Sequence, residues 1–456
     1  MLLPIAKLAA GSRVLLSAAS PLLRDALFYT LERCIHQARD TWSSPPITPM
    51  AWSPDENADV FASPGLIPRQ ESTSPFSADM HHPAQPAVHL HDASQTGPHT
   101  LLGRITHRDN LMRAWRRLAV KRNTASGSDR QSLASFAARL EAELHRLAGE
   151  MQTGTYRPHP LQCWHKTKED GRKRLIAIPT IRDRVAQAAI CQILEFSVAP
   201  TDNRWSFAYQ NGRGCREALA EVDQLLVNGG RWVVRADVQD CFDSIPHASL
   251  LAHLAAVTGD DPSVRGLLLP ILQGPRLLGR RLMFPRLGVP QGSPLSPFLA
   301  NIYLNGMDHT MGAAGFKYLR YADDLIIVCR EKTSAHTALE MLREECRKLE
   351  LQLNPAKSKV LDVQEQGFDF LGHRYTGGTW QAIPERIERV KRKIQHTLKS
   401  AGRSGAEGVT QAKVVLAGWK EFYRYRKAIP NSLIRWFDSQ IRRKTTPVDK
   451  HHSTGD

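Results

Sequence analysis

The chain has 456 residues, of which 42% are hydrophobic, and carries 61 Lys and Arg against 45 Asp and Glu, which predicts a globular protein with more than one domain. No two of its seven cysteines are spaced as Cys-x-x-Cys, which excludes a disulfide framework and a cysteine-based zinc site. No run of eighteen apolar residues is present, so we expect a cytoplasmic protein with no membrane partner.

The first hundred residues differ in composition from the rest. Residues 1–40 carry apolar side chains at helical spacing, such as Leu23, Leu27 and Leu31, and predict one or two short helices. Ten of the 28 prolines fall between residues 41 and 100, so we interpret residues 41–103 as a flexible Pro/Ser/His-rich linker. Five histidines between His81 and His99 are irregularly spaced, which favours a solvated segment over a metal site.

From Arg104 onward the apolar residues follow helical and strand periods. One helix is predicted by a spacing of three and four residues among Leu133, Phe136, Leu140, Leu144 and Leu147. We then expect, in order, a turn at 151–156, a strand at 174–178, a helix at 182–196, a strand at 231–238, two strands within 318–329, a helix at 334–349 and a strand near Val360. Past Thr376 strand patterns end and residues 385–445 look helical, so the fold class is α+β.

Positive charge is concentrated towards the C-terminus. Residues 1–100 hold six Lys and Arg against nine Asp and Glu, whereas residues 385–456 hold 17 against seven. Five aromatic residues are interleaved with this charge: Trp419, Phe422, Tyr423, Tyr425 and Trp436. Basic and aromatic side chains together indicate a polyanion with stackable bases, which means a nucleic acid. A solvated basic helix face is the alternative that charge alone leaves open.

Two acidic positions follow apolar strands. Asp237 ends the strand in RWVVRADVQD, and Asp323 and Asp324 lie at the turn in KYLRYADDLIIVC. Asp is a common turn residue, so neither position alone indicates a functional site. If the two strands are neighbours in one sheet, three carboxylates meet at one end of it, and their repulsion favours a divalent cation. Short carboxylates suit Mg²⁺, and two such ions serve in-line phosphoryl transfer. No Gly-x-x-x-x-Gly-Lys-Ser/Thr loop is present, which disfavours a P-loop nucleotide hydrolase.

These acidic stretches belong to a longer series of motifs. In the order and spacing of the reverse transcriptase palm, the chain contains DVQDCFDSI, GVPQGSPLSPFLANIYL, YADD, LNPAKSKV and FDFLGH. Upstream, KEDGRKRLIAIPTIRDRVAQAAI and SFAYQNGRG resemble the fingers of the bacterial group II intron-like branch, and AGWKEFYRYRK resembles the start of its thumb, or maturase, region. The chain therefore resembles a group II intron-like reverse transcriptase, an RNA-directed DNA polymerase, from about residue 104 to about residue 440.

The resemblance implies a right-hand polymerase fold. Fingers would span 104–215, a palm with an antiparallel sheet 216–375 and a helical thumb 376–445, with a disordered tail at 446–456. For the metal site, it implies that Asp237 and Asp323 bind two Mg²⁺ ions, with Asp324 beside them and the Val238 carbonyl as a backbone ligand.

The resemblance also assigns substrate contacts. Lys168 and Arg174 would hold the incoming dNTP triphosphate, and Phe242 would abut the sugar 2′ position and reject ribonucleotides. Gln291 and Gly292 would form the loop over the nascent base pair. Nucleic-acid contacts would come from the late-palm Lys357 and from Arg424 and Arg426 in the thumb, the partners being an RNA template and primer, or an RNA·DNA duplex.

Some features depart from the family pattern. Lys166-Thr167-Lys168 replaces the usual Ile-Pro-Lys, the segment at 207–210 is Phe-Ala-Tyr-Gln, and no Cys/His-rich endonuclease module follows the palm. Intron RNA, CRISPR integrase proteins during spacer acquisition, and phage defence all remain open as biological contexts. A maturase that acts by binding structured RNA and a template-independent DNA polymerase are the functional alternatives.

Overall fold

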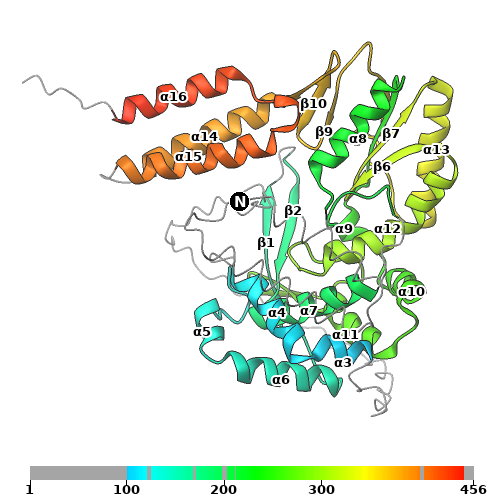
Figure 1. Cartoon of the computed structure of the whole chain (residues 1–456). Helices are drawn as coiled ribbons and strands as arrows, with labels where there is room; N and C mark the ends of the chain where they lie inside the picture. Colours follow the sequence, from blue (N-terminus) through cyan, green and yellow to red (C-terminus); the bar gives the residue numbers. More distant parts are fainter. Residues whose placement is uncertain are drawn as a thin grey trace, which may run out of the picture. The chain divides into compact units, whose positions relative to one another are not determined.

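The computed structural model describes residues 100–120, 125–167, 171–197, 203–210, 212–400 and 405–445, all within one compact unit, Arg69–Asp456 (Figure 1). The expectations for residues 1–40 and 446–456, nearly all of the linker, and Lys168 lie outside the described residues. Helix α3 begins at Leu101, so the folded chain starts inside the segment interpreted as linker. In the described part of the chain, every helix is too short or too polar to cross a membrane.

Five helices form the first part of the described chain: α3 (Leu101–Thr106), α4 (Arg108–Ala119), α5 (Leu133–Ala137), α6 (Leu140–Gln152) and α7 (Ile181–Ser197). The prediction of one helix through 133–147 is wrong, because Arg139 (φ −126°, ψ 26°) leaves the helical region and separates α5 from α6. Phe136, Leu144 and Leu147 are nonetheless buried, so the predicted apolar face is present on two helices. The predicted strand at 174–178 and helix at 182–196 are confirmed by β2 and α7.

A four-stranded sheet, ordered β2-β1-β4-β5, contains β1 (Leu161–Thr167), β2 (Lys173–Ile178), β4 (Arg276–Leu278) and β5 (Arg281–Met283). Strand β1 pairs antiparallel with β2 and parallel with β4. The sequence analysis predicted only β2, because β1 contains His165 and Lys166, and β4 and β5 have three residues each.

The second four-stranded sheet is antiparallel throughout, with the order β6-β7-β3-β8. Its strands, β3 (Trp232–Asp237), β6 (Lys317–Tyr321), β7 (Asp324–Cys329) and β8 (Lys359–Asp362), confirm the predicted strand, hairpin and strand. Both faces of the sheet are covered, which explains the unbroken apolar run Leu325–Cys329. Three helices pack against this sheet: α8 (Cys215–Val227), α12 (Ser296–Ala313) and α13 (Lys332–Lys348). The same part of the chain contains α9 (Cys241–Ser244), α10 (His247–Thr258) and α11 (Pro262–Gln273), of which α10 packs against α12 and α11 against α10.

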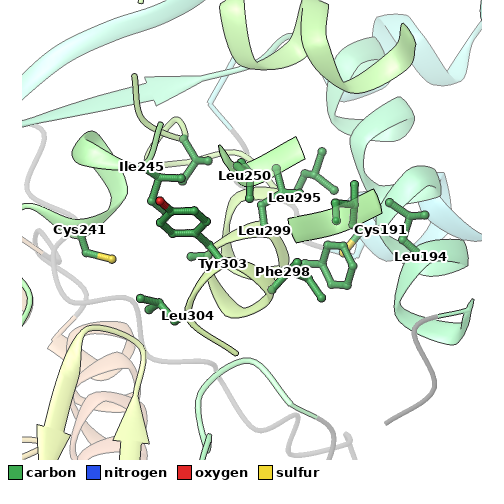
Figure 2. Packing of buried hydrophobic residues seen from close by; sticks show 14 of the residues in the cluster. Cys191, Leu194, Cys241, Ile245, Leu250, Leu295, Phe298, Leu299, Tyr303 and Leu304 are labelled. Carbon is green, nitrogen blue, oxygen red and sulfur yellow. The ribbon is translucent and has the colours of Figure 1, made fainter. Parts of the chain in front are cut away.

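The core beneath α9 is built on helix α12. Figure 2 shows Leu299 and Tyr303, four residues apart on one face of α12, and Leu295, which immediately precedes the helix, among Ile245 and Leu250. The Tyr303 hydroxyl is buried and donates to the Leu349 carbonyl oxygen at 2.7 Å, which satisfies the polar tip of this ring. This packed support fixes α9, which carries the predicted sugar-contacting residue Phe242.

The C-terminal part combines a small sheet with helices. Strands β9 (Phe368–Phe370), β10 (His373–Thr376) and β11 (Thr379–Ala382) pair in the order β11-β10-β9. The prediction that strands end at Thr376 is wrong: Gly377 and Gly378 both have positive φ and connect β10 to β11 as a two-residue hairpin turn. The helices are α14 (Pro384–Ser400), α15 (Gly405–Phe422), η2 (Tyr425–Lys427) and α16 (Asn431–Thr445), and Figure 1 shows α14, α15 and α16 side by side.

Candidate active site

Two of the predicted carboxylates lie directly opposite each other. Asp237 is the last residue of β3 and Asp324 the first of β7, and the two are register partners in the antiparallel pair. Their Cβ atoms are therefore about 5 Å apart on the same face of the sheet. The prediction that the two acidic strands are neighbours is confirmed.

Asp323 lies in the turn between β6 and β7. The preceding residue, Ala322, has a φ of 57°, a left-handed conformation that costs a non-glycine residue about 1–2 kcal/mol. The carbonyl oxygen of Asp323 accepts the Val238 N–H at 3.0 Å, which ties the turn to the residue after Asp237. The structure thus holds a strained backbone at the point where the acidic residues meet.

The local electrostatics disfavour a fully ionised cluster. Burial raises the pKa of Asp324 to about 6, and Asp323 and Asp237 act in the same direction. Burial, followed by the charge of Asp237, also raises the pKa of Asp323, whereas Arg174 and Lys357 act to lower it. Two half-buried acids beside a third carboxylate form a site that a cation stabilises.

The three Asp side chains supply some, but not all, of the ligands that a divalent cation needs. Asp324 Oδ1 is buried and accepts no hydrogen bond, and its nearest cationic atom is Arg235 Nη2 at 3.8 Å. Asp237 Oδ1 instead accepts from Lys357 Nζ at 3.0 Å. Among the described residues, no three His, Cys, Asp or Glu side chains are gathered closely enough to form a ligand group. Asp323 and Asp324 come from successive backbone positions, which face different directions, so ligation needs a backbone oxygen such as the predicted Val238 carbonyl.

We expect saturating Mg²⁺ to raise the melting temperature of the protein at constant ionic strength, because the cation relieves the repulsion among these acids. A ligand present at a hundred times its Kd stabilises by about 2.7 kcal/mol. Differential scanning fluorimetry of three proteins measures this: the wild type, Asp323→Asn, and Asp260→Asn as a control on an exposed carboxylate that pairs with Arg265. Asp323→Asn should lose the shift and Asp260→Asn should keep it; equal shifts in all three would contradict a site at the turn.

Of the predicted nucleotide contacts, Arg174 lies near the acidic turn, and Phe242 and Gln291 lie close to each other. Arg174, exposed on β2, is near enough to lower the pKa of Asp323. The loop at 288–292 packs against α9, where Val289 N–H donates to the Phe242 carbonyl at 2.6 Å and Gln291 Nε2 to Asp243 Oδ2 at 2.8 Å. The structure therefore brings Phe242 and Gln291 together, while their roles with nucleotides stay predictions.

Gly292 is required by a close approach of two backbones. Its φ is 128°, and a Cβ atom there would lie 2.8 Å from the Ala177 carbonyl oxygen. The adjacent Gln291 carbonyl accepts the Ala177 N–H at 2.8 Å. The loop and strand β2 are thus joined backbone to backbone, three residues along β2 from Arg174.

The two predicted thumb arginines have different surroundings. Arg424 is 61% exposed and lies 3.4 Å from the equally exposed Glu421. Arg426 donates through Nε and Nη2 to Asp223 of α8, whose side chain is 8% exposed and also accepts from the Tyr425 hydroxyl. The Arg426 guanidinium is therefore engaged in joining η2 to α8.

We expect Arg424→Ala to weaken binding to a generic RNA·DNA duplex and to flatten the slope of log K against log salt by about one unit, because one phosphate contact is lost. Arg426→Ala is the matched comparison: it should lower the melting temperature, because it leaves the buried Asp223 carboxylate without its cation. Fluorescence anisotropy across a salt series, together with thermal melts, separates the two. A wild-type salt slope in Arg424→Ala would leave the solvated-helix interpretation in place.

The sequence analysis missed a buried polar network and two further site residues. Arg320, just before the turn, is fully buried against Asp308, which is also fully buried. Arg235 lies beside Asp324, and Tyr209 is 56% exposed at a φ of 59°. Partial desolvation by the surrounding protein raises the pKa of Tyr209, as does the nearby charge of Asp323. A charged residue in the middle of an apolar strand was the available signal for Arg235 and Arg320.

Comparison with known proteins agrees with this geometry. Residues 166–375 match the family described as reverse transcriptase (RNA-dependent DNA polymerase). This stretch begins in β1 and ends in β10, so it includes all three acidic residues and the loop at 288–292.

Individual relatives match different shares of the chain. Protein YkfC of Escherichia coli is 29% identical over 317 residues, which are 60% of this chain and 82% of that protein. The group II intron-encoded protein LtrA of Lactococcus lactis is 30% identical over 228 residues, half of this chain but only 37% of LtrA. One chain of a solved "Partial Cas6-RT-Cas1--Cas2 complex" is 24% identical, covering 55% of this chain and 43% of that chain. Its TM-score of 0.35 is too low to support an inference about partners.

Proposed function

We propose that the chain is a group II intron-like reverse transcriptase, an RNA-directed DNA polymerase that adds dNTPs to a primer 3′-hydroxyl on an RNA template. The observation that carries the proposal is the opposition of Asp237 and Asp324 on neighbouring strands, with Asp323 in the strained turn between β6 and β7. We assign the fingers to residues 104–215, the palm to 216–375 and the thumb to 376–445.

The proposed roles follow from the surroundings of each side chain. Asp237, Asp323 and the Val238 carbonyl would hold two Mg²⁺ ions, with Asp324, whose Oδ1 accepts no hydrogen bond, beside them. When bound, divalent cations stabilise charge on the attacking and leaving oxygens of an in-line phosphoryl transfer.

The remaining roles belong to side chains that bind and orient the nucleotide. Arg174 would bind the triphosphate through its planar guanidinium, joined by Lys168. Gln291 and Gly292 would support the nascent base pair, and Phe242 would exclude a 2′-hydroxyl. Lys357, whose ammonium group pairs with Asp237 in the structure, would contact the nucleic acid when cations occupy the carboxylates.

Primer extension tests the proposal. The protein is given a labelled DNA primer annealed to an RNA template of defined sequence, all four dNTPs and Mg²⁺. Templated synthesis predicts products whose sequence is the complement of the RNA and which end at its 5′ terminus. Extension of the unannealed primer alone would favour the template-independent polymerase, and no extension in either case would refute the proposed activity.

A second function, maturase activity through binding of structured intron RNA, is favoured by the similarity to an intron-encoded protein. The chain spans about a third of that relative's length, so its other activities are proposals for this chain. The flanking genomic DNA distinguishes the contexts: intron RNA domains would support splicing, whereas a repeat array would support spacer acquisition beside a CRISPR integrase.

A further inference from the structure

A buried ion pair lies directly beneath the acidic turn. The Arg320 and Asp308 side chains are both fully buried. Arg320 Nε donates to Asp308 Oδ1 at 2.8 Å, and Nη2 donates to Oδ2 at 2.6 Å. The carboxylate also accepts from the Tyr318 hydroxyl at 2.8 Å and from Asn203 Nδ2 at 2.7 Å. Each charge thus has a partner and a set of hydrogen bonds, the condition under which a buried ion pair persists.

The remaining nitrogen of the guanidinium faces the turn. Arg320 Nη1 donates to Asn301 Oδ1 at 2.8 Å and to the Ala322 carbonyl oxygen at 3.2 Å. Ala322 is the residue with the left-handed backbone that immediately precedes Asp323. The planar guanidinium group of Arg320, which hydrogen-bonds to Asp308 and Asn301, therefore also contacts the strained backbone that precedes Asp323.

The same network reaches a second segment near the site. Asn301 Nδ2 donates to the Ala208 carbonyl at 3.0 Å, one residue before the exposed Tyr209. The Arg320 backbone exchanges hydrogen bonds with this segment, its N–H donating to the Trp205 carbonyl at 2.8 Å and its carbonyl accepting the Phe207 N–H at 2.9 Å. Asn301 of helix α12 thus hydrogen-bonds both to Arg320, which contacts the acidic turn, and to the segment at 205–208.

We propose that Arg320, oriented by Asn301 and Asp308, is a positioning residue for the polymerase reaction: its guanidinium holds the Ala322 carbonyl and thereby keeps Asp323 in the geometry that binds the catalytic cation. The inference rests on the proposed function and extends it to residues that touch neither substrate nor metal. Groups that orient metal ligands in this way change metal affinity or activity by roughly 10- to 100-fold when they are removed.

The test compares two matched variants on one face of α12. Asn301→Ala removes the acceptor that orients Nη1 and leaves the buried ion pair in place. Asn305→Ala removes an identical amide one turn away, which accepts from Asn203 at 2.6 Å and is not among the groups that hydrogen-bond to Arg320. A third variant, Arg320→Lys, keeps the charge beside Asp308 but lacks the fork that spans Asp308 and Ala322.

We expect Asn301→Ala to lower kcat about tenfold and to raise the Mg²⁺ concentration for half-maximal rate about tenfold, with the KM for dNTP nearly unchanged. Asn305→Ala should behave as the wild type in all three measurements. Arg320→Lys, if it melts cooperatively, should resemble Asn301→Ala. A purely structural role would lower the melting temperature of Asn301→Ala without shifting the Mg²⁺ dependence, and that result would overturn the proposal.

The Mg²⁺ concentration that produces half of the thermal shift gives a second readout, which does not depend on activity. If the wild type makes no cDNA, the proposed function fails, yet positioning still predicts that Asn301→Ala needs about tenfold more Mg²⁺ than Asn305→Ala for the same shift. Equal Mg²⁺ requirements in the two variants, or no thermal shift in the wild type, would refute the positioning role.

Discussion

Asp323→Asn is expected to abolish Mg²⁺-dependent cDNA synthesis while leaving the affinity for RNA unchanged. The substitution removes a carboxylate whose pKa is raised by burial and by Asp237, in a turn whose backbone is hydrogen-bonded to Val238. This carboxylate is the proposed metal ligand, and the proposal gives it no contact with the template. Loss of a group that stabilises developing charge lowers the rate by about a thousandfold, and we expect at least that loss.

Primer extension and RNA-binding measurements on the same preparations check this result. Asp260→Asn, which removes one negative charge from an exposed pair, controls for the change in net charge and should retain wild-type activity. Substantial extension by Asp323→Asn would show that the turn does not bind the catalytic cation.

Phe242→Ala is expected to admit ribonucleotides. The ring lies on α9, partly buried against the core shown in Figure 2, and its backbone carbonyl is fixed by Val289. Truncation opens space where the resemblance places the sugar 2′ carbon, so the ratio of kcat/KM for rNTPs to that for dNTPs should rise on the order of 10- to 100-fold, the range that pocket contacts supply.

Steady-state kinetics with each nucleotide pair measure that ratio. Phe316→Ala is a matched control, because Phe316 is also a partly buried phenylalanine on the same core. Both variants should lose stability, but Phe316→Ala should keep the wild-type sugar preference. If the two variants had the same ratio, Phe242 would be a core residue only.

The acidic end of the antiparallel sheet could be predicted because its signals are local. Strands β3 and β7 are apolar runs that end or begin with Asp, and register then requires Asp237 to face Asp324. The break between α5 and α6 could not be predicted, because apolar spacing continues across the non-helical Arg139. Strand β11 follows a Gly-Gly turn that is itself a hairpin signal, which the helical interpretation of the region overlooked.

The paired charges escaped prediction for a different reason. The pairing of Arg320 with Asp308 joins a strand to a helix, and that of Arg426 with Asp223 spans 203 residues of sequence. From the sequence, each of these charged side chains is expected on the solvated surface, because the neighbouring residues in the chain do not show whether a charge is paired in the fold. Arg426 was therefore assigned to nucleic acid, whereas its guanidinium joins two parts of the fold.

The contact at Gly292 limits how this protein can be recombined with its relatives. There is no room for a Cβ atom between Gly292 and the Ala177 carbonyl, and a main-chain hydrogen bond adjoins the contact. A chimaera that imports a foreign β1–β2 hairpin but keeps the native loop at 288–292 would have to reproduce this backbone spacing to within a few tenths of an ångström. The β1–β2 hairpin and the loop at 288–292 are more than a hundred residues apart in sequence, but they should be exchanged together. Crossover points for engineered hybrids should therefore not separate the origin of the two segments.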